Sequence, residues 1–178
     1  LRPAHTWNPV IINFKHLCQI LKDAYHANNF VDKMRIWFMP LGWRPNDVID
    51  KFPLEAAENP NLQKKYDPQN SNFQLGWSWI QFSLAGIFMF VIFYSMGEIS
   101  FLIINLTGGV LLLHIMSYTF LLDYNKLAMV MEFLKFISGC FVLFLLHQND
   151  FFISNIIYVL IISYLIVSMG ITIYLSNN

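Results

Sequence analysis

Four long apolar runs dominate the second half of the chain, at about residues 77–94, 99–121, 127–146 and 152–175. With a rise of about 1.5 Å per residue, helices of this length span a hydrocarbon core of roughly 30 Å. The linkers between the runs, "SMGE", "LDYNK" and "HQND", are long enough only for tight antiparallel hairpins. The pattern therefore predicts an all-α integral membrane protein in which residues 77–178 form a four-helix transmembrane bundle.

Residues 1–76 show a different pattern, which predicts a cytoplasmic or interfacial region that begins with an amphipathic helix from about Pro9 to Ala27. Asn8 can cap its first amides, and proline suits the first helical position because it lacks an N–H group. Lys15 and Lys22 lie off the apolar stripe of this helix. The stripe consists of Val10, Phe14, Leu17, Leu21 and Ala24. The helix either faces the core of a soluble subdomain or lies in the headgroup plane with its stripe in the bilayer.

A second short helix, about Phe30 to Phe38, leads into a loop region that is rich in aromatic residues and proline. Proline breaks regular structure repeatedly here, and we expect an ordered loop with one helical turn around Leu54 to Glu58. Tryptophan side chains favour the membrane–water boundary, whereas an arginine can reach lipid phosphates or loop carbonyls. The predicted interfacial or lipid-contact residues are Trp7, Trp37, Trp43 and Arg44.

Charge and cysteine content exclude several classes of protein. Only 12% of the 178 residues are charged, whereas about 25% is usual in soluble domains. The formal net charge is zero, so the chain lacks the clustered basic residues that a nucleic-acid surface needs. Cys18 and Cys140 provide neither a disulfide framework nor a CxxC pair. We therefore expect no nucleic-acid partner and no thiol chemistry.

The distribution of Lys and Arg predicts the orientation in the membrane. Nine of these residues precede the first apolar run and Lys126 follows the second run, while the other two loops contain none. Basic residues that flank membrane spans remain on the cytoplasmic side. The N-terminal region and the C-terminus are therefore predicted to be cytoplasmic, in a multi-pass protein that we expect in a bacterial inner membrane.

Three polar residues inside the apolar runs are candidate intramembrane sites. Glu132 and Lys135 lie three residues apart, so they can pair along one helix face; a proton or ion path would need further ionisable residues at matching depth. His114 can form interhelical hydrogen bonds or line a pocket that contacts a lipid head. No two histidines have the i, i+3 or i, i+4 spacing that a helical iron or zinc site needs. The sequence therefore assigns no catalytic and no metal-binding residue.

Several short motifs form an ordered series along the chain. They are "RP" at Arg2–Pro3, "WNP" at Trp7–Pro9, Asn13, "DK" at Asp32–Lys33, "GWRP" at Gly42–Pro45, "KYDP" at Lys65–Pro68 and "FLLDYNKLAMVMEFLK" at Phe120–Lys135. In this order they resemble the segment after the last histidine box in the sterol desaturase and fatty acid hydroxylase superfamily. The alkylglycerol monooxygenase branch is the most similar.

This resemblance implies a function in lipid oxidation. In the family, histidines in HxxxH and HxxHH boxes hold two irons that activate dioxygen to hydroxylate or desaturate a lipid, and the ether-lipid branch uses tetrahydrobiopterin. None of these boxes occurs in this sequence. The chain would then be the C-terminal membrane region of a di-iron oxidoreductase acting on an ether-lipid, fatty-acyl or sterol substrate. It would bind no cofactor and be inactive alone.

The implied partners are the lipid bilayer, a lipid substrate in the full-length protein, and a missing N-terminal catalytic part. Leu1 in place of an initiator methionine leads to the same expectation of a longer protein. The alternative is a non-catalytic small integral membrane protein with a structural or partner-binding role. A small transporter or channel is less favoured, because the apolar runs contain too few polar residues to line a path.

Overall fold

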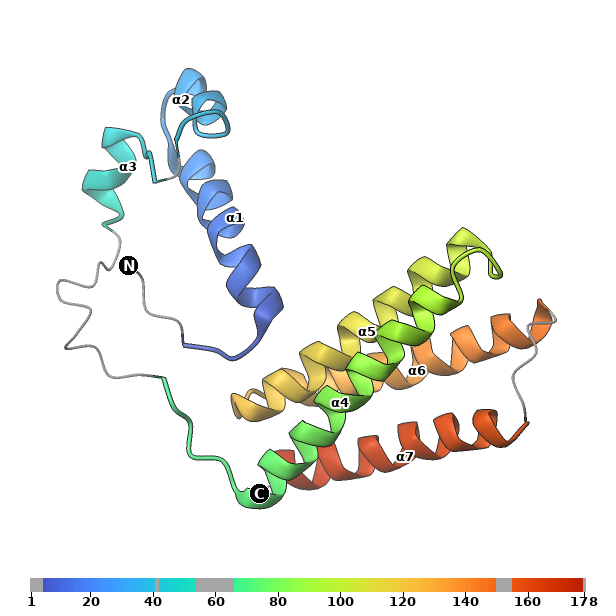
Figure 1. Cartoon of the computed structure of the whole chain (residues 1–178). Coiled ribbons are helices and arrows are strands. Elements are labelled where there is room, and N and C mark those ends of the chain that lie inside the picture. The colour runs from blue at the N-terminus through green and yellow to red at the C-terminus, as the bar shows by residue number, and fades with distance from the viewer. Residues whose placement is uncertain (1–4, 41, 54–65, 150–154, 178) are drawn as a thin grey trace. The chain divides into compact units, whose positions relative to one another are not determined.

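A computed structural model describes residues 5–40, 42–53, 66–149 and 155–177 of the chain. The described residues form seven α-helices and no β-strand, which confirms the predicted all-α fold. They belong to two compact units, unit 1 (Leu1–Asp67) and unit 2 (Pro68–Asn178). Helices α1 to α3 lie in unit 1 and helices α4 to α7 in unit 2 (Figure 1).

The longest helix of unit 1 is α1 (Pro9–His26), close to the predicted range. Its start is capped by Asn8, whose Oδ1 accepts hydrogen bonds from the N–H groups of Val10 and Ile11 at 3.0 and 3.2 Å. Such a cap satisfies amides that the first turn of a helix leaves without partners. The local sequence is thus sufficient to explain where this helix begins.

The two other helices of unit 1 are short and differ from the sequence-based expectation. Helix α2 (Phe30–Arg35) ends before Phe38, because the chain tightens into a turn in which the Phe38 N–H group donates to the Arg35 carbonyl at 3.0 Å. Helix α3 (Asn46–Lys51) was not predicted. It begins directly after Pro45, since proline breaks a helix in its interior but not at its start. The turn expected around residues 54–58 lies outside the described residues.

A buried ion pair connects α1 to the loop that precedes α3. The guanidinium of Arg44 forms two bonds with the Asp23 carboxylate, from Nε at 2.7 Å and from Nη2 at 2.8 Å. The same Nη2 donates to the Phe52 carbonyl at 3.0 Å. This fork-like geometry is the strongest form of a carboxylate–arginine contact. It fixes the loop against the C-terminal turns of α1.

The apolar stripe of α1 is not used for packing within unit 1. Phe14 is 55% exposed and Leu21 is 50% exposed, whereas Asp23 is the buried residue of this helix. The core-facing interpretation of the stripe therefore finds no support in the described part of unit 1. The interfacial interpretation remains a prediction.

Unit 2 consists of four long helices: α4 (Asn72–Tyr94), α5 (Phe101–Leu122), α6 (Leu127–Gln148) and α7 (Asn155–Asn177). Each is long and apolar enough to cross a membrane. Helix α5 packs against both α4 and α6, and α7 packs mainly against α6 (Figure 1). The first span starts at Asn72, before the predicted residue 77, because the Ser71 hydroxyl caps it by accepting from the Gln74 N–H group.

Two apolar clusters hold the bundle together, one toward each end. Trp77, Phe120, Leu121 and Ala128 form the cluster at the end where α4 begins. Ile103, Val110, Val142 and Leu146 form the cluster at the opposite end. Most other large apolar side chains of unit 2 point outward, as expected when the surroundings are lipid rather than water.

Gly139 on α6 is the one glycine in the described part of unit 2 at which an added Cβ atom would contact neighbouring helices. A Cβ atom at this position would lie 3.1 Å from Cδ1 of Leu165 on α7 and 3.9 Å from Cγ1 of Val110 on α5. Small residues at such crossings let membrane helices pack tightly. Any side chain at this position therefore requires Leu165 to shift, and a large side chain has no free space between α6 and α7.

We expect Gly139→Leu to lower the thermal unfolding temperature of the detergent-purified protein. Overpacking of this kind costs about 1 to 3 kcal/mol. Gly86→Leu is the matched control, because a Cβ atom at Gly86 meets no atom within 4 Å. Equal melting temperatures for the two variants would contradict a close contact at Gly139.

Candidate functional site

Polar groups from all four helices of unit 2 meet in one buried layer. Glu132 and Lys135 come from α6, His114 and Ser117 from α5, Tyr164 and Ser168 from α7, and Gln81 from α4. His114 is 5% exposed, Glu132 and Lys135 are 1% exposed, and Gln81, Ser117 and Ser168 are fully buried. We call these seven residues the polar layer. The structure thus brings together the three intramembrane candidates that the sequence analysis treated separately.

The ion pair is the centre of the polar layer. Nζ of Lys135 lies 2.6 Å from Oε1 of Glu132. The Ser117 hydroxyl donates to Oε2 of Glu132 at 2.5 Å, and Nζ of Lys135 donates to Oγ of Ser168 at 2.8 Å. Each charge therefore has its partner on α6 and a second, neutral partner on a neighbouring helix. Two charges buried in this way require such additional bonds to offset the loss of water.

His114 extends the layer toward α4. Its Nε2 lies 2.9 Å from the backbone carbonyl oxygen of Gln81, and its Nδ1 lies 3.2 Å from the Tyr164 hydroxyl. A carbonyl can only accept, so Nε2 carries the proton and Nδ1 accepts from the tyrosine. The Lys135 ammonium lies 5.4 Å from the centre of the Tyr164 ring, within cation–π range. Tyr164 thus joins the histidine to the ion pair.

Several polar atoms within or near this layer form no hydrogen bond with the described residues. They are Nε2 and Oε1 of Gln81, Oγ of Ser78, Nε1 of Trp77 and Oγ1 of Thr172. Buried polar groups usually have a partner, because leaving one without a hydrogen bond costs about 1 to 3 kcal/mol. The layer therefore has more hydrogen-bonding capacity than its internal contacts use.

This geometry favours an interhelical network over a ligand-contacting site. The ion pair and the two serines connect α5, α6 and α7, while His114 connects α5, α4 and α7. Substrate contact requires an accessible group, and the side chains of Glu132 and Lys135 are each 1% exposed. We interpret the layer as the element that fixes the positions of the four helices.

The predicted interfacial residues lie in unit 1, where they have different surroundings. Trp7 is 52% exposed and Trp37 is 46% exposed, while Trp43 is half-buried. The Arg44 side chain is only 8% exposed because it is bonded to Asp23 and to a loop carbonyl. The sequence left two roles open for Arg44, contact with lipid phosphates or with loop carbonyls, and the structure shows the loop contact.

The described residues do not fit a di-iron centre. No group of three or more His, Cys, Asp or Glu side chains in the described ranges is close enough to hold a metal ion. Two of the histidines also have their own partners: His114 bonds to Gln81 and Tyr164, and Nδ1 of His26 lies 2.7 Å from the Lys22 carbonyl oxygen. Iron ligands of the kind that the family resemblance implies would have to come from outside the described residues.

Comparison with known proteins gives one informative similarity. The chain is 25% identical to human alkylglycerol monooxygenase over 133 residues. The matched part is 75% of this chain but only 30% of that enzyme. No protein-family model and no solved structure matches the chain. The similarity is therefore distant and partial, and it relates the chain to a lipid oxidoreductase.

The polar-layer residues on α4 and α7 were not predicted from the sequence, because its polar residues were considered one at a time and not as faces of a helix. On α4, Gln74, Ser78 and Gln81 recur at helical spacing within an apolar run. On α7, Tyr164, Ser168 and Thr172 do the same. Such polar stripes in otherwise apolar helices are a sequence signal for an inward-facing side. Reading them together predicts that α4 and α7 contribute to a buried polar site.

We expect Glu132→Leu to lower the yield of folded protein, because it leaves the Lys135 ammonium buried without a carboxylate. Removing one partner of a buried pair costs about 3 to 5 kcal/mol, whereas replacing both partners with apolar residues is often neutral or stabilising. The double variant E132L/K135L should therefore regain much of the loss. The measurements are the monodisperse fraction in gel filtration and the thermal unfolding temperature.

Glu98→Leu is the matched control for this experiment, because it removes a carboxylate from an exposed position between α4 and α5. It should leave both measurements unchanged. A Glu132→Leu protein as stable as the control would contradict the assignment of the pair to a stabilising network.

Proposed function

We propose that this chain is the membrane region of a dioxygen-dependent, di-iron lipid oxidoreductase of the hydroxylase or desaturase type. The observation that carries this proposal is the similarity to alkylglycerol monooxygenase over 75% of the chain. The match covers only 30% of that enzyme, and we propose that the iron-binding part lies in a preceding segment of a longer protein, as the family resemblance implies. The described residues of this chain do not fit that metal centre, so the chain alone is proposed to be inactive.

The proposed role of the chain is to position a lipid for oxidation. Unit 2 supplies four helices that can span the membrane, and the polar layer fixes their arrangement. Unit 1 directly precedes the first span in sequence and exposes Trp7 and Trp37. Exposed tryptophans of this kind are typical of the membrane–water boundary, where a lipid headgroup lies. Unit 1 is therefore proposed to form one wall of the path by which lipid reaches the missing catalytic part.

The test is to express the complete coding region that contains this chain, and to express the chain by itself. We expect the complete protein to copurify with iron and to oxidise a long-chain lipid in the presence of dioxygen and a reductant. The chain alone should insert into membranes without iron and without turnover. A complete protein that folds but contains no iron would favour the non-catalytic membrane protein instead.

A Trp37→Ala/Trp43→Ala variant of the complete protein separates lipid entry from metal binding. We expect a loss of lipid turnover with unchanged iron content, because the tryptophans contact the lipid and not the metal. Equal losses of turnover and iron would mean that they serve only the fold. Tyr25→Ala is a control for the loss of an aromatic ring, since Tyr25 is 80% exposed in unit 1.

We further propose that unit 1 and the C-terminus face the cytoplasm, as the Lys and Arg distribution predicts. Cys18 provides a native probe, since it is exposed on α1, whereas Cys140 lies within the α6 span. In a Cys140→Ser protein, a membrane-impermeant maleimide should label Cys18 in inverted vesicles but not in intact cells. Cys18→Ser gives the background, and labelling in intact cells would reverse the proposed orientation.

A further inference from the structure

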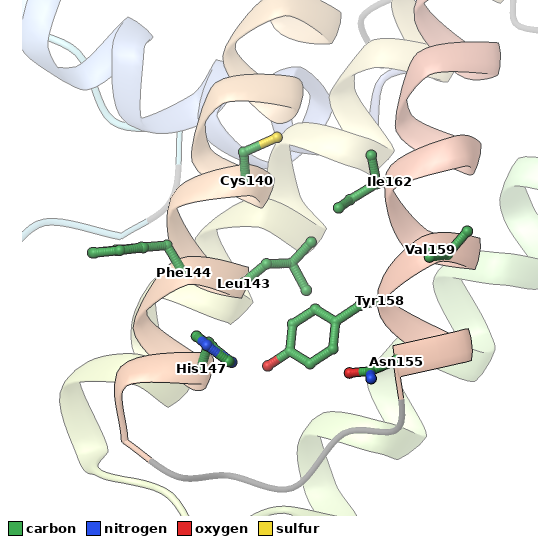
Figure 2. A pocket seen from close by; sticks show the side chains of 8 residues that line it. All are labelled: Cys140, Leu143, Phe144, His147, Asn155, Tyr158, Val159 and Ile162. Carbon is green, nitrogen blue, oxygen red and sulfur yellow. The ribbon is translucent and has the colours of Figure 1, made fainter.

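A groove of about 460 Å³ lies between α6 and α7. Its volume is within the roughly 300 to 1,000 Å³ that is typical of small-molecule sites. Figure 2 shows that both helices line it. It lies where α6 ends and α7 begins, at the opposite end of the bundle from the start of α4. The polar layer does not contribute to it.

The groove follows one face of each helix over two turns. On α6 it extends from Cys140 to His147, and on α7 from Asn155 to Ile162, eight residues in each case. Two turns correspond to a length of about 10 Å, which is less than half of a hydrocarbon core of about 30 Å. The groove therefore fits within one leaflet of a membrane.

Polar and apolar groups are separated along this groove. Figure 2 shows His147, Asn155 and Tyr158 at one end and Cys140 and Ile162 at the other. The polar end coincides with the helix termini, where lipid headgroups lie, and the apolar end points into the span. Phe144 is 56% exposed and Val159 is 65% exposed, so the flank of the groove is open to lipid. The polar-to-apolar direction of the groove matches the orientation of an amphiphilic lipid in one leaflet of a membrane.

The polar end contains a hydrogen-bond donor that requires an acceptor. The Tyr158 hydroxyl oxygen is buried and has no hydrogen-bond partner among the described residues. The His147 ring lies edge-on to the Tyr158 ring at 6.1 Å between centroids and adds a second polar group. A hydroxyl shielded from water is satisfied by a carbonyl oxygen of a bound molecule.

Charge decides which headgroup fits. No Lys, Arg, Asp or Glu lines the groove. The linkers at this end of the bundle, "SMGE" and "HQND", contain no Lys or Arg that could bind a phosphate. An anionic head would therefore lose its hydration without gaining a charged partner. The lining is suited to an uncharged head with carbonyl and hydroxyl oxygens.

We propose that this groove binds a neutral acylglycerol of the membrane, with one acyl chain between α6 and α7. The Tyr158 hydroxyl donates to the ester carbonyl, which is the first polar group above the acyl chain. His147 and Asn155 lie beside the glycerol hydroxyls, because each of them can both donate and accept. The lipid is held rather than oxidised, so the proposal is independent of the oxidoreductase function.

The test uses the chain in phosphatidylcholine nanodiscs with a monoacylglycerol that carries a photoreactive diazirine in its acyl chain. After illumination, mass spectrometry locates the adducts on the protein. We expect them to concentrate on the residues that line the apolar part of the groove, which are Cys140, Leu143, Phe144, Val159 and Ile162. Unlabelled monoacylglycerol should reduce their yield, whereas a fatty acid of equal length should not.

The Tyr158→Phe variant tests the hydrogen bond. We expect the adduct yield in the groove to fall about fivefold, which is the effect of losing one neutral hydrogen bond. Tyr94→Phe is the matched control, because Tyr94 is 88% exposed at the same end of the bundle and does not line the groove. A 1-O-alkylglycerol, which lacks the ester carbonyl, should compete more weakly than the monoacylglycerol.

A second variant tests occupancy of the groove without changing Tyr158. Val159→Trp fills the groove from its exposed flank and should abolish the adducts within it. The proposal is overturned if adducts are spread evenly over the lipid-facing residues. It is also overturned if the fatty acid or the alkylglycerol competes as well as the monoacylglycerol, or if both substitutions leave the adduct yield unchanged.

Discussion

Glu132 and Lys135 place two opposite charges inside an apolar bundle, and the neighbouring helices have to satisfy them. The carboxylate accepts from Ser117 on α5, and the ammonium donates to Ser168 on α7. A shift of either helix by one residue rotates its face by about 100°, which would remove the serine from its charge. Lipid tails provide no substitute partner, since they are apolar. The ion pair therefore restricts the register of three helices at once, and His114 adds the fourth through the Gln81 carbonyl.

The spans could be predicted from the sequence because each requires only a long apolar run, and the cap of α1 could be predicted because Asn8 is a local signal. The contact between Glu132 and Lys135 was also local, since both lie on one turn of one helix. The partners on other helices could not be predicted, because hydropathy does not encode which faces meet. Helix α3 was missed for a related reason: a six-residue helix after a proline has too short an apolar pattern to stand out from a loop.

Unit 1 differs from a typical water-soluble domain in its arrangement of polar and apolar groups. Its buried contacts include the ion pair of Asp23 with Arg44, while Phe14 and Leu21 on α1 are exposed. A water-soluble domain usually buries such a stripe and exposes the charges. The arrangement suits a surface that meets lipid or another part of a larger protein, which agrees with the proposed membrane region of a lipid oxidoreductase. In both units, then, a buried ion pair contributes to the interior, and many large apolar side chains are exposed.

The distribution of the polar layer over the helices has a consequence for biosynthesis. Charged residues within a span oppose insertion, at a cost that reaches about 2.5 to 3.5 kcal/mol each at its centre on translocon-based scales. Glu132 and Lys135 belong to α6, but Ser168 and Tyr164 belong to α7, the last of the four helices to leave the ribosome. While α7 is still being made, the Lys135 ammonium has its carboxylate but not its serine. Completion of the layer, and with it the final register of the earlier helices, therefore coincides with the entry of the last span into the bilayer.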